Sequence, residues 1–182
     1  MLVLLLGMLV ICSLSCSGGR GGGLVWHGGL TAGCVCLSGW NGGQQVGVAC
    51  LLAVVLAGCV GLLGVQMLHV PASGRERSVI RLAGGLVCVT VLAQVIVQGA
   101  VGDMAQRFMV MAALCAILCG AWGACIARGP AALCAGLACG LDGVMLLGAR
   151  AGSTPVMLVV IVAAAGLNAV MASIPRAGGD SS

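Results

Sequence analysis

Five long apolar runs constrain this chain more than any other feature of its sequence. They cover residues 46–70, 79–102, 108–127, 130–149 and 155–174. An α-helix of about 20 residues crosses the roughly 30 Å hydrocarbon core of a bilayer. Because no water is present there to satisfy backbone N–H and C=O groups, such runs are expected to be helical. The sequence therefore predicts an all-α fold, a polytopic transmembrane helix bundle over residues 46–174.

The composition also indicates that lipid surrounds much of the protein surface. Of the 182 residues, 61% are hydrophobic and 7% are charged, whereas a soluble domain carries roughly 25% charged residues. The lipid bilayer is therefore the first expected partner, and the expected location is an integral, multi-pass membrane protein in an unspecified membrane. A nucleic-acid surface needs a dense basic stripe with aromatic stacking partners. With eight Arg, no Lys, one Phe and no Tyr, binding of nucleic acid is not expected.

The two ends of the chain differ from the five runs. Residues 1–14 are apolar but short for a span, so a cleaved signal peptide and a short first transmembrane helix both remain open. The bundle accordingly has five or six spans. Residues 15–45 are rich in Gly and Cys without a helical period, and are expected to form an exoplasmic loop. The excess of Arg on the side of the membrane opposite this loop predicts that residues 175–182 are cytoplasmic. This tail is expected to be disordered.

The cysteines are expected to serve mainly as small apolar residues. Eight of the twelve lie inside the apolar runs, where Cys packs like a small hydrophobe. In the exoplasmic loop, Cys16 is close enough in sequence to form a disulfide with Cys34 or Cys36. A metal site from His27, Cys34 and Cys36 is the alternative. Its ligand spacing matches no common zinc site, so no metal is expected.

Small residues recur at every fourth position in several runs. Such stripes let helix backbones approach closely, within one chain or between copies of it. A homo-oligomer or assembly with other membrane proteins is therefore a second expected partner. The residues expected to mediate helix packing are Ala53, Ala57, Gly61, Ala116, Gly120, Gly136 and Gly140.

Asp142 is the only acidic residue well inside an apolar run. An intramembrane acid either bonds a neighbouring helix or lies on a transport or proton path. Asn168 lies at a similar depth in the last run, and Gln94 and Gln98 share a face of the second run. These four residues are expected to form one polar seam. With no basic residue at the depth of Asp142, the structural hypothesis is favoured over transport.

The motifs of common enzyme classes are absent. The sequence contains no HExxH, P-loop, GxSxG or CxxC pattern, each of which would place metal ligands, phosphate-binding amides or a nucleophile. No enzymatic activity, catalytic residue or cofactor is therefore expected.

One stretch covers about a quarter of the chain and has a distinctive series of residues. They are Gly64 and Met67, then Arg75, Glu76 and Arg77, then Gly84 and Gly85, Leu92 and Ala93, Gly99 and Ala100, and finally Gln106, Arg107 and Phe108. This stretch resembles the second and third helices of the claudin and peripheral myelin protein tetraspan group. The resemblance implies a structural or adhesive membrane protein.

The leading expected function is a structural or interaction role for a multi-pass membrane protein that assembles through small-residue helix faces. One alternative is a small transporter or channel that uses Asp142. Another is a viral envelope or accessory membrane protein.

Overall fold

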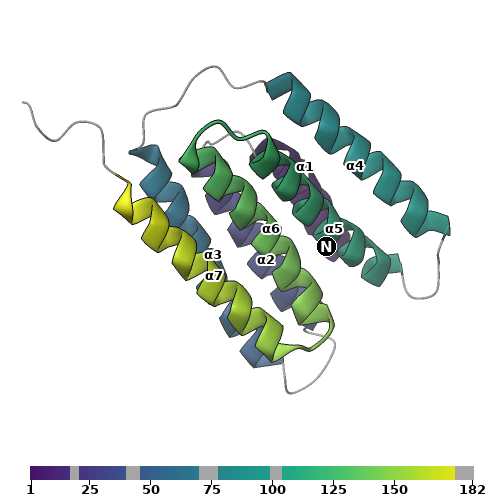
Figure 1. Ribbon diagram of the computed structural model, residues 1–182. Coiled ribbons are helices and arrows are strands. Elements are labelled where there is room, and N and C mark those ends of the chain that lie inside the picture. Colours follow the sequence, from purple (N-terminus) through teal and green to yellow (C-terminus); the bar gives the residue numbers. More distant parts are fainter. Residues whose placement is uncertain (17–20, 40–45, 70–77, 99–103, 175–182) are drawn as a thin grey trace, which may run out of the picture.

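The computed structural model describes residues 1–16, 21–39, 46–69, 78–98 and 104–174. Over these residues the chain forms seven α-helices and no strand, arranged as a bundle with roughly aligned axes (Figure 1). The helices are α1 (Leu2–Cys16), α2 (Gly21–Gly39), α3 (Val46–Leu68), α4 (Ser78–Gln98), α5 (Met104–Cys125), α6 (Pro130–Arg150) and α7 (Thr154–Ser173). The predicted all-α class is confirmed.

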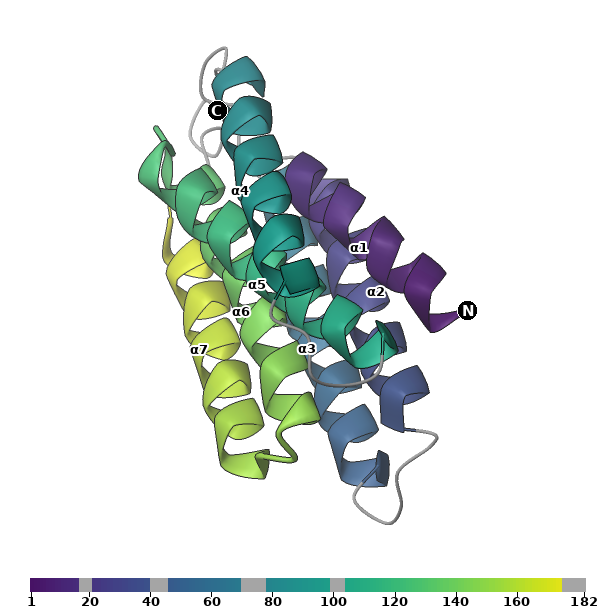
Figure 2. The ribbon, with the colours of Figure 1, turned by 90° about the vertical axis from the view of Figure 1, so that its right-hand side faces the viewer.

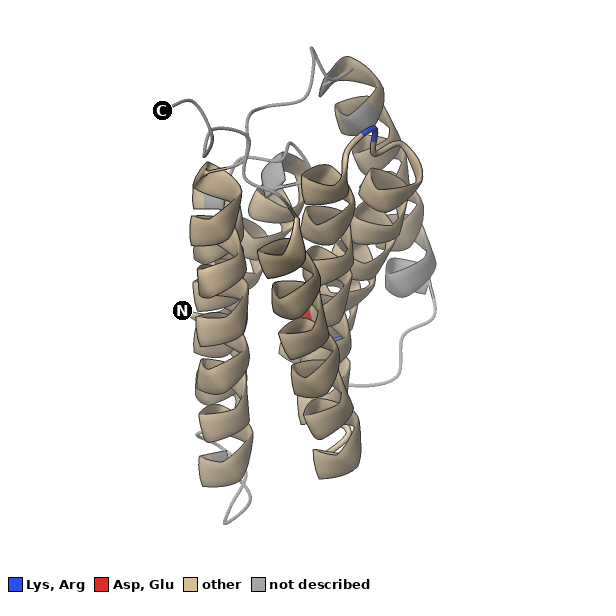
Figure 3. Ribbon diagram, turned by 60° about the vertical axis from the view of Figure 1, so that its left-hand side comes forward, with Lys and Arg blue, Asp and Glu red and all other residues tan. Residues whose placement is uncertain are grey.

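Four of the helices are long and apolar enough to cross a membrane. They are Gly47–Leu68, Ala105–Cys125, Pro130–Arg150 and Thr154–Ser173. Their ribbons carry very few charged positions (Figure 3), and many of their large apolar side chains face outward, as expected where lipid is the solvent. The protein is thus an integral membrane protein by the length and composition of these helices. The apolar segments of α1 and α4 are shorter, and they cover Leu2–Leu14 and Leu82–Gln94.

The expected loop over residues 15–45 is wrong for most of its length, because Gly21–Gly39 is helix α2. Glycine lowers intrinsic helix propensity by about 1 kcal/mol per residue relative to Ala, which is why the sequence pattern does not indicate a helix here. Packing overrides this preference, since α2 contacts α1, α3 and α6. At Gly28 an added Cβ would lie 3.2 Å from the Val60 side chain, so α2 and α3 approach closely there.

Helix α6 is central and α4 is peripheral. Helix α6 contacts α1, α2, α3, α5 and α7, whereas α4 contacts only α5 and α1; Figure 2 shows α4 in front of α5 and beside α1. One apolar cluster joins α3, α6 and α7 through buried side chains such as Leu56, Met145 and Val160. A second cluster joins α1, α2 and α5 through side chains such as Leu6 and Ala112.

Candidate functional site

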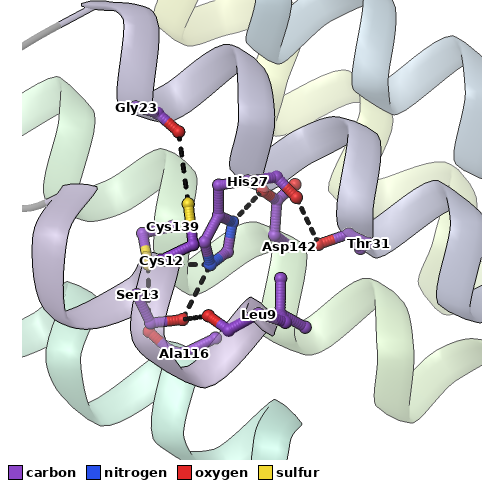
Figure 4. Close-up of polar contacts among 9 residues, drawn as sticks. All are labelled: Leu9, Cys12, Ser13, Gly23, His27, Thr31, Ala116, Cys139 and Asp142. Atoms are coloured by element: carbon purple, nitrogen blue, oxygen red, sulfur yellow. Dashed lines mark hydrogen bonds and ion pairs between the residues drawn. The ribbon is translucent and has the colours of Figure 1, made fainter. Parts of the chain in front are cut away.

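Asp142, at the middle of α6, forms a hydrogen-bonded acid–base pair with His27 of α2. His27 Nδ1 lies 2.6 Å from Asp142 Oδ2, and both side chains are 0% exposed. The two residues are 115 positions apart in sequence and meet because α2 packs directly on α6 (Figure 4). The acid therefore has a basic partner at its own depth, which the sequence did not indicate.

The second ring nitrogen of His27 faces α1. Its Nε2 lies 2.8 Å from Ser13 Oγ and 3.5 Å from Cys139 Sγ. Ser13 is 0% exposed and also donates a hydrogen bond to the Leu9 carbonyl at 2.8 Å. His27 thus connects α1 to α6 through one continuous chain of hydrogen-bonding groups, Ser13–His27–Asp142 (Figure 4).

A further buried hydroxyl, that of Thr31, lies near the pair. Thr31 Oγ1 donates to the His27 carbonyl at 3.0 Å, one helical turn along α2. This bond lies within α2 and does not reach the imidazole ring. Thr31 therefore does not belong to the Ser13–His27–Asp142 chain.

The hydrogen-bond partners restrict where the protons lie. A serine hydroxyl has a single proton, and in the geometry where Ser13 donates to the Leu9 carbonyl, His27 Nε2 must donate to Ser13 Oγ. One further proton is then shared between His27 Nδ1 and Asp142 Oδ2. Whether it resides on the ring or on the carboxyl, the pair has no net charge, which is the arrangement that a low-dielectric interior favours.

One carboxyl oxygen of Asp142 has no partner. Asp142 Oδ1 is buried and accepts no hydrogen bond within the part of the chain that the structure describes. A buried, unsatisfied oxygen raises the free energy of the ionised carboxylate more than that of the neutral acid. Among the described residues, Asp142 therefore depends on His27 for its side-chain hydrogen bond.

The order Ser–His–Asp is also that of hydrolytic triads, but the surroundings differ from those of a hydrolase. A nucleophilic serine needs space for a substrate carbonyl and nearby oxyanion donors. Ser13 is completely buried, lies within helix α1 and donates its hydroxyl proton to the helix backbone. The geometry favours proton exchange over acyl transfer, and the absence of enzymatic activity stays a prediction.

Among the described side chains, the expected polar seam does not form between Asp142, Asn168 and Gln94. Asn168 of α7 donates instead to the Cys59 carbonyl of α3 at 3.0 Å and to the Ala164 carbonyl at 2.9 Å. Gln94 is exposed on α4, which contacts neither α6 nor α7. The side chain of Gln98 lies outside the described residues. The seam is wrong because α4 occupies the edge of the bundle, whereas α2 occupies the position next to Asp142.

The small residues of α5 and α6 lie at the closest contact between helices. An added Cβ at Gly120 would lie 2.5 Å from the Gly136 carbonyl oxygen, and one at Gly136 would lie 2.7 Å from the Ala124 nitrogen. Ala116 is fully buried on the same helix as Gly120. These contacts join two helices of one chain, so they do not require a second copy.

The remaining packing residues are placed differently. Ala53 is buried in the cluster of α1, α2 and α5, and Ala57 is half-buried beside it. At Gly61 and Gly140 an added Cβ would meet nothing within 4 Å. Close approach through Gly61 was expected, and the structure does not show it, because this face of α3 points away from its neighbours.

The expected disulfide is not formed by the loop cysteines. Cys34 and Cys36 are free thiols, and the side chain of Cys16 lies outside the described residues. Cys34 is fully buried in an apolar cluster with Leu6 and Ala53, because the segment is a packed helix. His27 directs both ring nitrogens to Asp142, Ser13 and Cys139. Among the described residues no group of three His, Cys, Asp or Glu side chains could hold a metal ion.

The sequence pattern does not indicate that His27 is the partner of Asp142, or that Ser13 is the partner of His27. Both lie in N-terminal segments that were assigned to a signal peptide or first helix and to a loop. The signal that could have identified His27 is chemical. A carboxyl group in the middle of an apolar run needs a partner, and the chain contains only two His.

Comparison of the chain with protein-family models, with curated proteins and with solved structures finds no match. The resemblance of the segment from Gly64 to Phe108 to the claudin and peripheral myelin protein group therefore stays a prediction.

Proposed function

We propose that this protein is a small multi-pass membrane transporter in which the His27–Asp142 pair takes up and releases a proton. One observation carries the proposal: two titratable side chains on different helices meet at 2.6 Å in a fully buried position. Of the four acidic residues, Asp142 alone lies within the described part of the chain. We also propose that α1 and α4 add a fifth and a sixth span to the four long apolar helices.

The membrane setting supports a transport role for this pair. Ionisable residues inside a bilayer are costly to insert, face the interior of the bundle and commonly mark ion or proton pathways. The pair can hold its shared proton on either partner without changing its net charge. The sequence argument against transport was the lack of a basic residue at the depth of Asp142, and His27 removes that objection.

The helix that carries His27 is suited to a small movement. Seven of the 19 residues of α2 are glycine, so its helical form depends on packing against its neighbours more than on intrinsic propensity. Elements with low local stability are those that move in functional transitions. A shift of α2 relative to α6 would open the contact between His27 and Asp142.

A structural role is the second candidate, and the contacts between α5 and α6 favour it. Backbone approach at Gly120 and Gly136 is what a tightly packed scaffold requires. In that case the His27–Asp142 pair would act only to hold α2 on α6. Assembly with other membrane proteins, including a role in a viral envelope, belongs to this candidate.

Proton flux into liposomes separates the two candidates. The full-length protein is reconstituted with a pH-sensitive dye inside the vesicles, and a potassium diffusion potential drives proton entry. Transport predicts flux above that of empty liposomes and its loss in Asp142→Asn, which keeps the size of the side chain but cannot release a proton. Thr90→Val is a suitable control, because Thr90 is exposed and bonds only its own helix.

Two results would contradict the transport proposal. One is a wild-type flux no greater than that of empty liposomes. The other is an equal flux in Asp142→Asn and wild type. Either result, with variants that stay monodisperse in detergent, would leave the structural role as the better account of the pair.

A further inference from the structure

Ser13 lies where a proton would have to enter or leave the buried pair on the α1 side. Its Oγ is 2.8 Å from His27 Nε2 and 2.8 Å from the Leu9 carbonyl oxygen. A single hydroxyl proton therefore has two acceptors at equal distance. Ser13 is completely buried in this conformation, so these two groups are the hydrogen-bond partners that the structure gives its hydroxyl.

The orientation of the Ser13 hydroxyl is coupled to the proton content of the pair. When Ser13 donates to the Leu9 carbonyl, His27 Nε2 carries a proton and the pair is neutral. When Ser13 donates to Nε2, that nitrogen has no proton, Nδ1–H donates to the Asp142 carboxylate, and the pair carries one negative charge. The two orientations differ by one proton, and no heavy atom has to move between them.

We propose that Ser13 is the relay through which the His27–Asp142 pair exchanges its proton, which makes α1 part of the functional site. This inference rests on the proposed proton transport. In the release step, movement of the helices admits a water molecule beside Ser13, whose Oγ accepts the Nε2 proton as it passes its own proton to that water. The N–H bond of His27 and the O–H bond of Ser13 break, a new O–H bond forms on each oxygen, and no electrons are exchanged.

The other groups around the chain do not offer the same path. Besides Asp142, the titratable side chains that interact with His27 are the thiols of Cys139 on α6 and Cys119 on α5. A third thiol, that of Cys12 on α1, donates to the Gly23 carbonyl. Cys139 Sγ is 3.5 Å from Nε2, a longer contact than that of Ser13, and it also lies 3.5 Å from the Ala116 carbonyl oxygen. From α3, the apolar Val60 lies against Gly28.

The proposal predicts different behaviour for variants at Ser13. Ser13→Ala removes the hydroxyl and should lower proton flux roughly 100-fold, the lower end of the range for a positioned proton-transfer group. Ser13→Thr retains a hydroxyl on the same helix and should restore most of the flux. Thr31→Val is the matched control, because it removes a buried hydroxyl that bonds only the His27 carbonyl and should leave the flux near that of wild type.

The nitrogen-15 shifts of the His27 ring supply a second measurement that needs no variant. In the wild-type protein in lipid, Nε2 should be protonated at low pH and should lose its proton as the pH rises. In Ser13→Thr the same change should occur. An Nε2 that is unprotonated at every pH tested would overturn the relay even if Ser13→Ala failed to fold.

The outcomes for the relay and for the proposed function are distinct. Flux in wild type that persists unchanged in Ser13→Ala would overturn the relay alone and leave proton transport by the pair intact. Absence of flux in wild type would overturn both. A Thr31→Val variant as impaired as Ser13→Ala would also overturn the relay, since any lost buried hydroxyl would then have the same effect.

Discussion

Helix α6 is held by α5 and by α2 in two different ways. Against α5, glycines bring the backbones together, and an added Cβ at Gly136 would lie 2.7 Å from both the Ala124 nitrogen and the Gly120 carbonyl oxygen. Against α2, a charged or proton-sharing side-chain pair makes the contact, with 2.6 Å between His27 Nδ1 and Asp142 Oδ2. The first contact is sensitive to added volume, and the second is sensitive to the loss of a partner.

The physical reason for this difference is the solvent. Lipid tails are as apolar as Leu, so helices in a bilayer gain little by burying apolar surface and associate through close packing and hydrogen bonds. Close packing fails when a side chain separates the backbones. A buried pair fails when one member is removed and the other is left without compensation. On the α5 face of α6, the loss of stability should therefore depend on the volume that a substitution adds. On the α2 face, it should depend on whether the substitution removes one member of the buried pair.

The largest effect is expected from His27→Leu, which leaves Asp142 buried without a basic partner. Breaking a buried ion pair by removing one member costs about 3–5 kcal/mol, so the thermal unfolding temperature in detergent should fall sharply. The double variant His27→Leu/Asp142→Leu removes both polar groups and should recover much of the loss. A double variant that is less stable than the single one would show that the pair does not couple α2 to α6.

A smaller loss is expected for Gly136→Ala on the α5 face. The added methyl group meets backbone atoms, which cannot rotate away, and overpacking of this kind typically costs about 1–3 kcal/mol. Gly140→Ala is the matched control on the same helix, because its Cβ would meet nothing within 4 Å. Gly61→Ala should be equally harmless for the same reason. Unfolding of the purified variants in one detergent would measure all three, and equal stability would argue against close packing of α5 on α6.

The smallest effect is expected for Asn168→Leu, between α3 and α7. This change removes the bonds to the Cys59 and Ala164 carbonyls, and interhelical hydrogen bonds in membranes average about 0.6 kcal/mol with a maximum near 1.7. Gln94→Leu is the comparison, since Gln94 is exposed on α4 and should change stability less. The same unfolding assay applies. A larger loss for Gln94→Leu would indicate that α4 carries a polar contact absent from this structure.

The sequence by itself determined the all-α class and the positions of the long apolar helices. The starts and ends of α3, α6 and α7 agree with the predicted runs to within a few residues, because hydrophobicity over about 20 residues decides where a chain can cross a bilayer. The sequence also identified Asp142 as the unusual residue, since the cost of placing a charge in hydrocarbon depends only on its depth. The small residues of α5 and α6 were recognisable as well, from their four-residue spacing.

Tertiary structure alone decided which residues Asp142 meets. Helix α2 has a sequence that favours a loop, and only packing between α1, α3 and α6 makes it a helix and brings His27 into the bundle. The order of the helices around α6 placed α2 beside Asp142 and α4 at the edge, which separated Asp142 from Gln94 and Asn168. Spacing along one helix shows which residues share a face, but the neighbour of that face depends on how all seven helices pack.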